Sequence, residues 1–257
     1  MGKYNYTIED IKNALFNIGL KNGDSIFIHS NIGFFGRLKD CNLVEDYYKA
    51  FKEAIFEVIG ESGTMINPTF SYSFCNKNKF NLKETPGICG VFSETARLDT
   101  DAIRSEDANF SIVAIGAKAK YFTENVPEYS FGKNSFWDKF FKENGIIVNF
   151  NFDTGSTFIH YIERQLKVPY RYDKGFPGKL IKDNREFESK FYHFVYDLSK
   201  PEHSPNFPSF HKKAVESNLV KTANLGKGRI SSITAQNTFN LIKDELNKDP
   251  NFLIKGK

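Results

Sequence analysis

The sequence predicts an α/β protein with a mixed sheet that is largely parallel in its N-terminal part and antiparallel in its C-terminal part. A short apolar run, an amphipathic stretch and a second apolar run follow one another within residues 25–67, as in a right-handed β-α-β unit. From Lys190 the pattern changes to aromatic residues with intervening polar residues, which is typical of exposed antiparallel strands. No internal repeat or linker-like stretch is visible, so we expect a single domain over residues 1–257.

The N-terminal part contains two expected helices and two expected strands. Thr7 and Asp10 have the spacing of a capping box, and apolar residues then recur at helical spacing as far as Gly19. A buried strand, an amphipathic helix that ends at Gly60 and a strand stopped by Pro68 follow, at residues 25–29, 43–58 and 64–67.

Residues 71–90 show little periodicity and are expected to form a long irregular segment. A loop of this length inside a compact domain usually binds a ligand or is partly disordered. Its rings could stack on a flat base and its lysines could pair with a pyrophosphate; these residues are Tyr72, Phe74, Lys77, Lys79 and Phe80. A mobile surface loop without a ligand is the alternative.

Two more short apolar runs, at residues 112–115 and 146–150, are expected to be strands. Asp153 and Thr154 directly follow the second run and could cap a helix that runs through Glu163. A hairpin and a final helix are expected after the alternating region, over residues 219–230 and 235–246.

The composition indicates a globular protein and excludes several classes of partner. Apolar residues make up 40% and charged residues 26% of the chain, which is enough to build a packed core. The net charge of +4 is too small and too dispersed for a nucleic-acid surface. The N-terminus lacks an apolar signal segment, no run is long enough to span a bilayer, and the three cysteines lack CxxC pairing. We therefore expect a cytoplasmic protein with no membrane partner; the sequence does not predict an oligomeric state.

His160 and Glu163 form the most suggestive pair of polar residues. Three residues apart, they lie on one face of the expected helix, where the carboxylate could orient or polarise the imidazole. The pair follows the strand at residues 146–150, and α/β folds usually bind ligands beyond the carboxyl ends of their strands. By spacing alone, a surface pair without a catalytic role is the commoner outcome.

The other histidines are weaker candidates. His29 ends the first strand and precedes a polar turn, residues 30–33, whose N–H groups could face an anion; a partly buried histidine without that role is equally compatible. His193 is expected to pack or to face solvent, and His203 and His211 are expected to lie in loops. No set of histidines, cysteines and acidic residues has the spacing of a zinc site, so no metal is expected.

Six segments, in order along nearly the whole chain, resemble the aminoglycoside 3-N-acetyltransferase family. They include the sequences GTMINPTF, GVFSETAR and STFIHYIE, and they occupy residues 23–30, 63–70, 90–97, 104–116, 156–163 and 168–171. The chain departs from the family where an Arg-Ser-x-His-Pro pattern is usual, because Asp107 and Ala108 stand in place of the last two residues.

The resemblance implies the mixed α/β fold of that family, acyl-CoA as the acyl donor and a sugar amine as the acceptor. It implies that His160 is the general base that removes a proton from the amine, with Glu163 orienting it. Glu94 is a second carboxylate that could bind the amine or help to position His160. Cys89 is instead expected to be an inert thiol, since direct transfer in a ternary complex needs no cysteine nucleophile.

Nine residues are therefore expected to contact the two substrates or to support the reaction around His160. The expected contacts to the CoA phosphates, through N–H groups and charge, involve Ser30, Asn31, Ile32, Gly33 and Arg37. The side chains of Ser111 and Thr157 could donate hydrogen bonds to the pantetheine or to the thioester oxygen. Glu94 and Glu163 complete the set.

The acceptor is predicted from charge. Some relatives resemble enzymes that acylate nucleotide-linked amino sugars for cell-surface glycans, and this slightly basic, aromatic-rich chain suits such an anionic acceptor better than a polycationic drug. We therefore expect an N-acyltransferase acting on a nucleotide-linked amino deoxysugar in polysaccharide biosynthesis. Antibiotic resistance through acetylation of an aminoglycoside is the first alternative, and a non-catalytic binding member of the family is the second.

Overall fold

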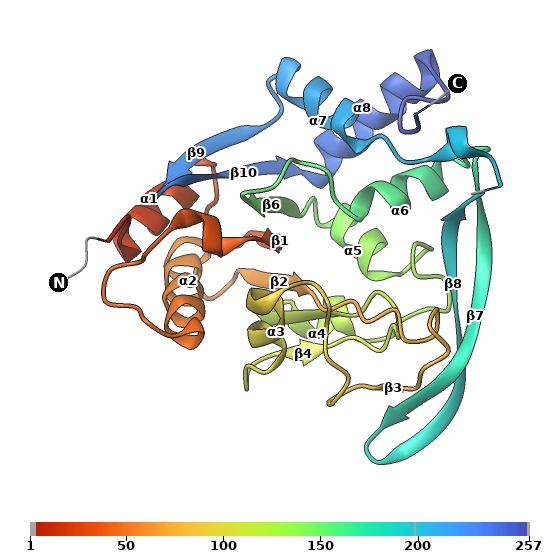
Figure 1. Ribbon diagram of the computed structural model, residues 1–257, viewed down its shortest axis with the longest axis horizontal. Coiled ribbons are helices and arrows are strands. Elements are labelled where there is room, and N and C mark those ends of the chain that lie inside the picture. Colours follow the sequence, from red (N-terminus) through yellow and green to blue (C-terminus); the bar gives the residue numbers. More distant parts are fainter. Residues whose placement is uncertain (1–3, 198, 256–257) are drawn as a thin grey trace.

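The computed structural model describes residues 4–197 and 199–255, which form two β-sheets with helices on both faces of the larger one (Figure 1). The larger sheet has the strand order β4-β5-β2-β1-β6-β10-β9, with β1 Ser25–Ser30, β2 Thr64–Pro68, β4 Ile103–Arg104, β5 Ile112–Gly116, β6 Ile146–Phe150, β9 Lys221–Leu225 and β10 Gly228–Thr234. The smaller sheet has the order β3-β7-β8, with β3 Phe80–Asn81, β7 Arg171–Lys182 and β8 Arg185–Tyr196. The helices are α1 Ile8–Asn17, α2 Val44–Ile59, α3 Val91–Arg97, α4 Ala119–Thr123, α5 Phe136–Lys142, α6 Phe158–Gln165, α7 Phe207–Glu216 and α8 Ala235–Lys248, with 3₁₀ turns η1 Ile32–Phe35 and η2 Pro201–His203.

The centre of the larger sheet is parallel, as the β-α-β pattern predicted. β1 lies between β2 and β6, and its Phe27 is paired with Ile66 on one side and Ile147 on the other. β5 and β10 run antiparallel to β2 and β6. The mixed sheet is confirmed, and its parallel part is confined to three strands.

Alternate residues of the central strands point to opposite faces and enter two separate cores. Ile26 and Ile28 pack with residues of α1, α2 and α3. Phe27 instead packs with residues of α4, α5, α6, α7 and α8. Because β1 and β6 are parallel and in register, with Ser30 paired to Phe150, the segments that follow them begin side by side at one edge of the sheet.

The predicted capping box and the first two helices are confirmed. Thr7 Oγ1 accepts a hydrogen bond of 3.1 Å from the Asp10 N–H, and Asp10 Oδ2 accepts one of 2.8 Å from the Thr7 N–H. α2 ends at Gly60, whose φ of +67° lies in the region that glycine adopts most readily. Within the described residues, no helix is both long enough and apolar enough to cross a membrane.

Two sequence-based expectations about helices are wrong. The helix that carries His160 begins at Phe158 with Thr157 as its N-cap, later than Asp153 and Thr154 suggested. The Thr154 hydroxyl is instead 3.0 Å from Nδ1 of His211. His211 itself lies on α7, whereas the sequence suggested a loop there.

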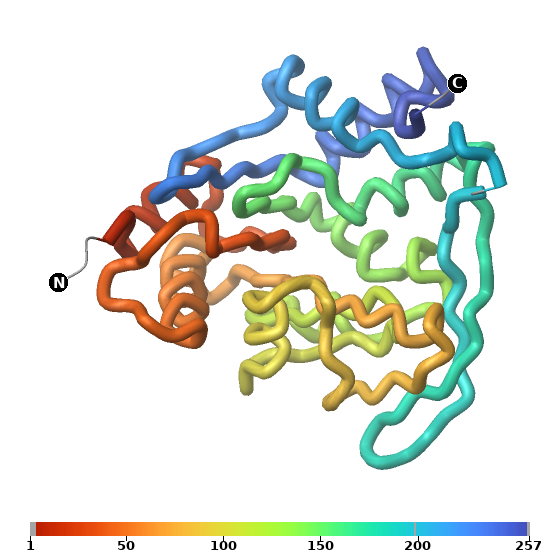
Figure 2. Tube along the Cα trace, viewed as in Figure 1, coloured from red at the N-terminus to blue at the C-terminus, as the bar shows by residue number. Residues whose placement is uncertain are grey.

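Of the long hairpin β7–β8, the sequence predicted only part of β8. It did not predict β7, which lacks a clean alternation of apolar and polar residues. Figure 2 shows the segment of residues 71–90 running beside this hairpin, and the short strand β3 pairs with β7. Phe74 and Phe80 are buried in a small third core with Leu180 and Phe191. The segment is irregular as expected, but these two rings fill the space beneath the hairpin and are not available for stacking on a ligand.

Candidate active site

His160 and Glu163 lie on one face of α6, the helix that follows β6. Ile159 and Ile162 of the same helix are buried in the core, which fixes its rotation. The Nδ1 atom of His160 is 3.1 Å from Oε2 of Glu163. The Glu163 side chain is fully buried and the His160 side chain is 20% exposed, so the imidazole lies at the edge of the interior.

Aromatic rings surround the His160 imidazole. Its centroid lies 5.6 Å from those of Phe131 and Phe207 and 6.2 Å from that of Tyr196. Burial, followed by the positive charge of Arg171, lowers the pKa of His160 to about 4, although Glu163 opposes this shift. The imidazole is therefore neutral at neutral pH and can accept a proton.

Arg171, the first residue of β7, completes this cluster. Its Nη2 lies 2.8 Å from Nδ1 of His160, and its Nε lies 3.1 Å from Oε2 of Glu163. One signal in the sequence pointed to Arg171, its place in the family-like segment Val168–Arg171, but no signal indicated this contact.

Two cavities adjoin one another beside this cluster. The larger, of about 690 Å³, is lined by the turn after β1, the start of α2 and the start of α3, and it includes Ser30, Asn31, Ile32 and Gly33. The smaller, of about 330 Å³, is lined by His29, Phe152, Asp153, Gly155, Phe207 and Pro208. Phe152 lines both cavities, so they adjoin one another. His160 lines neither, and its ring centroid lies 5.6 Å from that of Phe207, which lines the smaller one.

The turn after β1 presents polar groups to the larger cavity. The Ser30 hydroxyl oxygen is buried without a hydrogen-bond partner among the described residues. The Asn31 N–H is already bonded to the Phe150 carbonyl, at 3.0 Å. Arg37 is exposed, next to Gly36, which lines the cavity. The structure thus brings the predicted residues 30–33 together around one cavity and leaves Arg37 at its margin.

Ser111 and Thr157 differ in their surroundings. Ser111 is fully buried; its hydroxyl donates to the Thr69 carbonyl at 2.7 Å and accepts from Nε of Arg104 at 3.2 Å. Thr157 is half-buried at the start of α6 and makes no side-chain capping bond within the described chain. Thr157 therefore has a hydroxyl available near His160, whereas the Ser111 hydroxyl already has partners.

The Glu94 carboxylate joins α3, whose first residues line the larger cavity, to the loop before it. It receives hydrogen bonds of 2.7–3.0 Å from the Arg97 guanidinium and one of 2.8 Å from the Gly87 N–H. These partners lower the pKa of Glu94 despite its partial burial. The contacts connect α3 to the preceding loop and do not join Glu94 to the cluster around His160, so its catalytic role stays a prediction from the sequence.

The remaining histidines have other partners. His29 lines the smaller cavity, and burial lowers its pKa to about 4. Nε2 of His29 is buried without a partner among the described residues. His193 is buried, with Nε2 2.9 Å from Nδ2 of Asn109 and Nδ1 3.6 Å from Sγ of Cys75. In the described part of the chain, no three histidine, cysteine or acidic side chains gather as metal ligands would.

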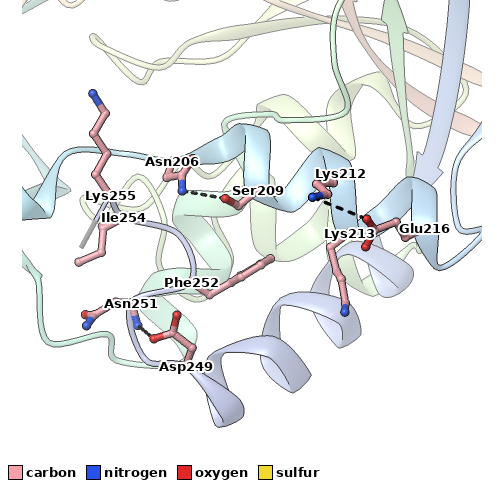
Figure 3. A pocket seen from close by; sticks show the side chains of 10 residues that line it. All are labelled: Asn206, Ser209, Lys212, Lys213, Glu216, Asp249, Asn251, Phe252, Ile254 and Lys255. Atoms are coloured by element: carbon pink, nitrogen blue, oxygen red, sulfur yellow. Dashed lines mark hydrogen bonds and ion pairs between the residues drawn. The ribbon is translucent and has the colours of Figure 1, made fainter. Parts of the chain in front are cut away.

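A third cavity, of about 560 Å³, lies between α7 and the C-terminal segment (Figure 3). Its lining is mostly charged or amide side chains, among them Lys212, Lys213, Glu216, Asp249 and Asn251. Lys212 and Glu216 face one another at 4.0 Å. It shares no lining residue with the two cavities beside His160.

The profile of the aminoglycoside 3-N-acetyltransferase family matches residues 27–247. The chain belongs to the aminoglycoside 3-N-acetyltransferase family. It is therefore an acyl-CoA-dependent N-acyltransferase, as the resemblance of its six segments predicted. A comparison of the sequence with curated proteins found no match.

Solved structures with this fold include several aminoglycoside acetyltransferases. AAC-IIIb, in a binary complex with CoASH, has a TM-score of 0.80 and 20% identity, covering 94% of this chain and 96% of that one. AAC(3)-IIb has a TM-score of 0.81 and 18% identity, covering 96% of this chain and 98% of that one. The YokD protein from Bacillus subtilis has a TM-score of 0.76 and 16% identity, covering 96% of this chain and 95% of that one. At these identities the likeness shows the fold of this acetyltransferase family.

Cys89 lines the larger cavity, so its reactivity can be tested directly. Burial raises the pKa of its thiol to about 11, which leaves it protonated and weakly nucleophilic at neutral pH. We expect Cys89→Ala to retain kcat within a few-fold, and kinetics in which both substrates must bind before any product leaves. Ping-pong kinetics, or an acyl group trapped on Cys89 and detected by mass spectrometry, would contradict this expectation.

Proposed function

We propose that this family member transfers an acyl group from acyl-CoA to the amino group of a nucleotide-linked amino sugar, in one domain spanning residues 1–257. The observation that carries the proposal is the position of the His160 imidazole. It is oriented by a buried carboxylate at 3.1 Å and lies beside two adjoining cavities that together offer room for two substrates. The reaction is then a direct transfer between substrates that are bound at the same time.

His160 acts in this proposal as the general base. With Glu163 accepting the hydrogen of Nδ1, the lone pair of Nε2 is free to remove a proton from the attacking amine. The low pKa of His160 keeps the ring neutral across the pH range in which an amine is partly deprotonated. The proton can afterwards pass to the departing CoA thiolate, which balances the transfer.

The larger cavity is the proposed site of CoA. Its volume, the unpartnered Ser30 hydroxyl and the turn that follows β1 suit a pantetheine arm and its phosphates. The smaller cavity continues from there past Phe152 to Phe207, whose ring centroid lies 5.6 Å from that of His160. Thr157 is the proposed donor to the thioester oxygen, because its hydroxyl lies at the start of the same helix.

The nature of the acceptor is inferred from charge. Among the described residues that line the two cavities, Asp153 is the only one with a carboxylate. Asp153 is already paired with His211 at 3.3 Å and with Arg229 at 3.4 Å. A polycationic drug needs several carboxylates to replace its hydration, whereas an amino sugar joined to a nucleotide does not.

Acetylation of an aminoglycoside is the second candidate. The family takes its name from that reaction, and structural relatives have been solved with a gentamicin or with sisomicin bound. In this chain the free acidic groups for such a ligand would have to come from outside the two cavities described above.

A thiol-release assay separates the two candidates. The acceptors are a nucleotide-linked amino deoxysugar, the same amino sugar without its nucleotide, and gentamicin, each tested with acetyl-CoA and longer acyl-CoAs. We expect the highest kcat/KM with the nucleotide-linked sugar, and a decrease as salt screens its phosphates. A reaction without enzyme provides the rate of uncatalysed thioester aminolysis, and His160→Asn provides the rate without the proposed base. Efficient turnover of gentamicin without turnover of the nucleotide-linked sugar would contradict the proposal and support the second candidate.

A further inference from the structure

The two cavities beside His160 lack the positive charge that a nucleotide needs. CoA carries a 3′-phosphate and a diphosphate on its adenosine, and the proposed acceptor carries a nucleotide as well. Among the described residues that line the two cavities, none is a lysine or an arginine. The turn after β1 offers them only neutral groups, such as the Ser30 hydroxyl. A cationic surface for these phosphates is therefore expected next to the two cavities.

A further cavity, of about 490 Å³, has such a surface and adjoins the larger cavity at Asn31, which lines both. It lies between the turn after β1 and the turn that joins β9 to β10, and its other lining residues are Phe34, Asn151, Asn224, Lys227, Gly228 and Arg229. Two of these side chains are cationic, and within the described part of the chain no carboxylate lines the cavity. We refer to it as the Lys227 cavity.

Backbone contacts hold Lys227 at the tip of the β9–β10 hairpin. Its N–H donates a hydrogen bond of 3.0 Å to the Phe35 carbonyl of η1. The glycines on either side pack closely: a Cβ atom at Gly226 would overlap the Phe35 carbonyl oxygen, and one at Gly228 would overlap Oδ1 of Asn151. The position of Lys227 relative to the turn after β1 is therefore fixed by the fold.

The Asn151 side chain joins the opposite walls of the Lys227 cavity. Its Nδ2 donates a hydrogen bond of 2.9 Å to the Asn31 carbonyl, and its Oδ1 accepts one of 3.0 Å from the Arg229 N–H. Nη2 of Arg229 lies 3.4 Å from Oδ1 of Asp153, which lines the smaller cavity. The Lys227 cavity is thus preformed, and it borders the larger cavity at Asn31 and the smaller one at Asp153.

Phe34 adds an aromatic surface to this cationic cavity. Its side chain is 67% exposed, the highest fraction among the large apolar residues of the described chain. A ring exposed to this degree contributes little to the core, whereas the face of a nucleotide base can stack on it. A cation pair and an exposed ring in one cavity match the phosphates and the base of a nucleotide.

We propose that the Lys227 cavity binds the nucleotide of a substrate, with Lys227 and Arg229 pairing with its phosphates and Phe34 stacking on its base. CoA and the nucleotide-linked acceptor are the two possible sources of this nucleotide. The second source rests on the proposed function, whereas the first rests only on membership of an acyl-CoA-dependent family.

Isothermal titration calorimetry with adenosine 3′,5′-bisphosphate, the end group of CoA, and with UDP tests the proposal without turnover. We expect Lys227→Gln to weaken binding of at least one probe by about two- to fivefold, and by less as salt is added. Phe34→Ala should weaken it by at least about fivefold, with little dependence on salt. Both side chains are exposed, so the variants should fold. Lys212→Gln is the matched control, because Lys212 is an exposed lysine that lines the third cavity, and it should change neither affinity.

The probe that loses affinity identifies the source of the nucleotide. A loss for adenosine 3′,5′-bisphosphate assigns the Lys227 cavity to CoA, and a loss for UDP assigns it to the acceptor; the KM of that substrate should rise with it. Unchanged affinity for both probes in both variants, or an equal loss in Lys212→Gln, would overturn the proposal. Turnover of gentamicin alone would contradict the proposed acceptor and leave the CoA arm of the titration intact, so the two failures are distinguishable.

Discussion

His160→Asn is expected to lower kcat for acyl transfer by at least about a hundredfold, the smallest effect usual for loss of a general base. Asparagine is smaller than histidine and has no group that takes up a proton at neutral pH. The melting temperature is expected to change little, because the side chain lies at the edge of the interior and is 20% exposed. Steady-state kinetics with saturating acyl-CoA, together with a thermal melt, measure both quantities.

His193→Asn is a matched control for this prediction. His193 is also a buried histidine with a lowered pKa, but its ring nitrogens face Asn109 and Cys75. Its replacement should lower the melting temperature and leave kcat within a few-fold. If His160→Asn kept kcat within a few-fold as well, His160 would not be the base.

The sequence predicted the parts of the fold that depend on local patterns. The capping box at Thr7, the short buried strand that begins at Ser25 and the helix that ends at Gly60 are each determined by residues within one or two turns. The hairpin at residues 171–196 was harder, because β7 contains Gly175, Pro177 and Gly178 and lacks a clean alternation. Its long pairing with β8 follows from contacts that no local pattern shows.

The segment of residues 71–90 shows the same limit at the level of function. Its composition suggested a surface for a flat, charged ligand, but contacts with Arg104 hold the segment in place. The guanidinium donates hydrogen bonds to the carbonyls of Thr69, Leu82 and Thr85, and it lies 4.7 Å from the ring of Phe80. Contacts of this kind, between residues far apart in the chain, cannot be read from the composition of the loop.

In the candidate site too, the sequence predicted a contact within one helix and did not predict contacts between elements. The spacing of His160 and Glu163 on a helix predicted their contact, since residues three apart share a helix face. Arg171 joins them from the start of a different element, and Glu94 is instead paired with Arg97 on its own helix. Charge partners that come from a different element are set by the tertiary fold.

Glu163→Leu is expected to lower the free energy of unfolding by about 3–5 kcal/mol, since it leaves the buried Arg171 guanidinium without its counter-charge. Both side chains are almost completely inaccessible, at 0% and 2% exposed, so water cannot replace the lost partner. Urea denaturation followed by tryptophan fluorescence measures the change, because the single Trp137 is buried in the core that contains α6. A loss below about 1 kcal/mol, typical of an exposed pair, would contradict the buried-pair description.

A double-mutant cycle separates the charge pair from the packing around it. Glu163→Leu with Arg171→Met removes both charges and leaves apolar side chains of similar length in the same space. Breaking a buried pair is costly because it strands one charge, whereas replacing the whole pair with apolar groups is often neutral. We therefore expect the double variant to lose less stability than the sum of the two single losses, and less than Glu163→Leu alone. Its kcat should nevertheless stay low, because without the Glu163 carboxylate nothing in the cluster accepts the Nδ1 hydrogen of His160. Stability recovered without activity would show that the buried pair contributes more to the reaction at His160 than to the stability of the fold.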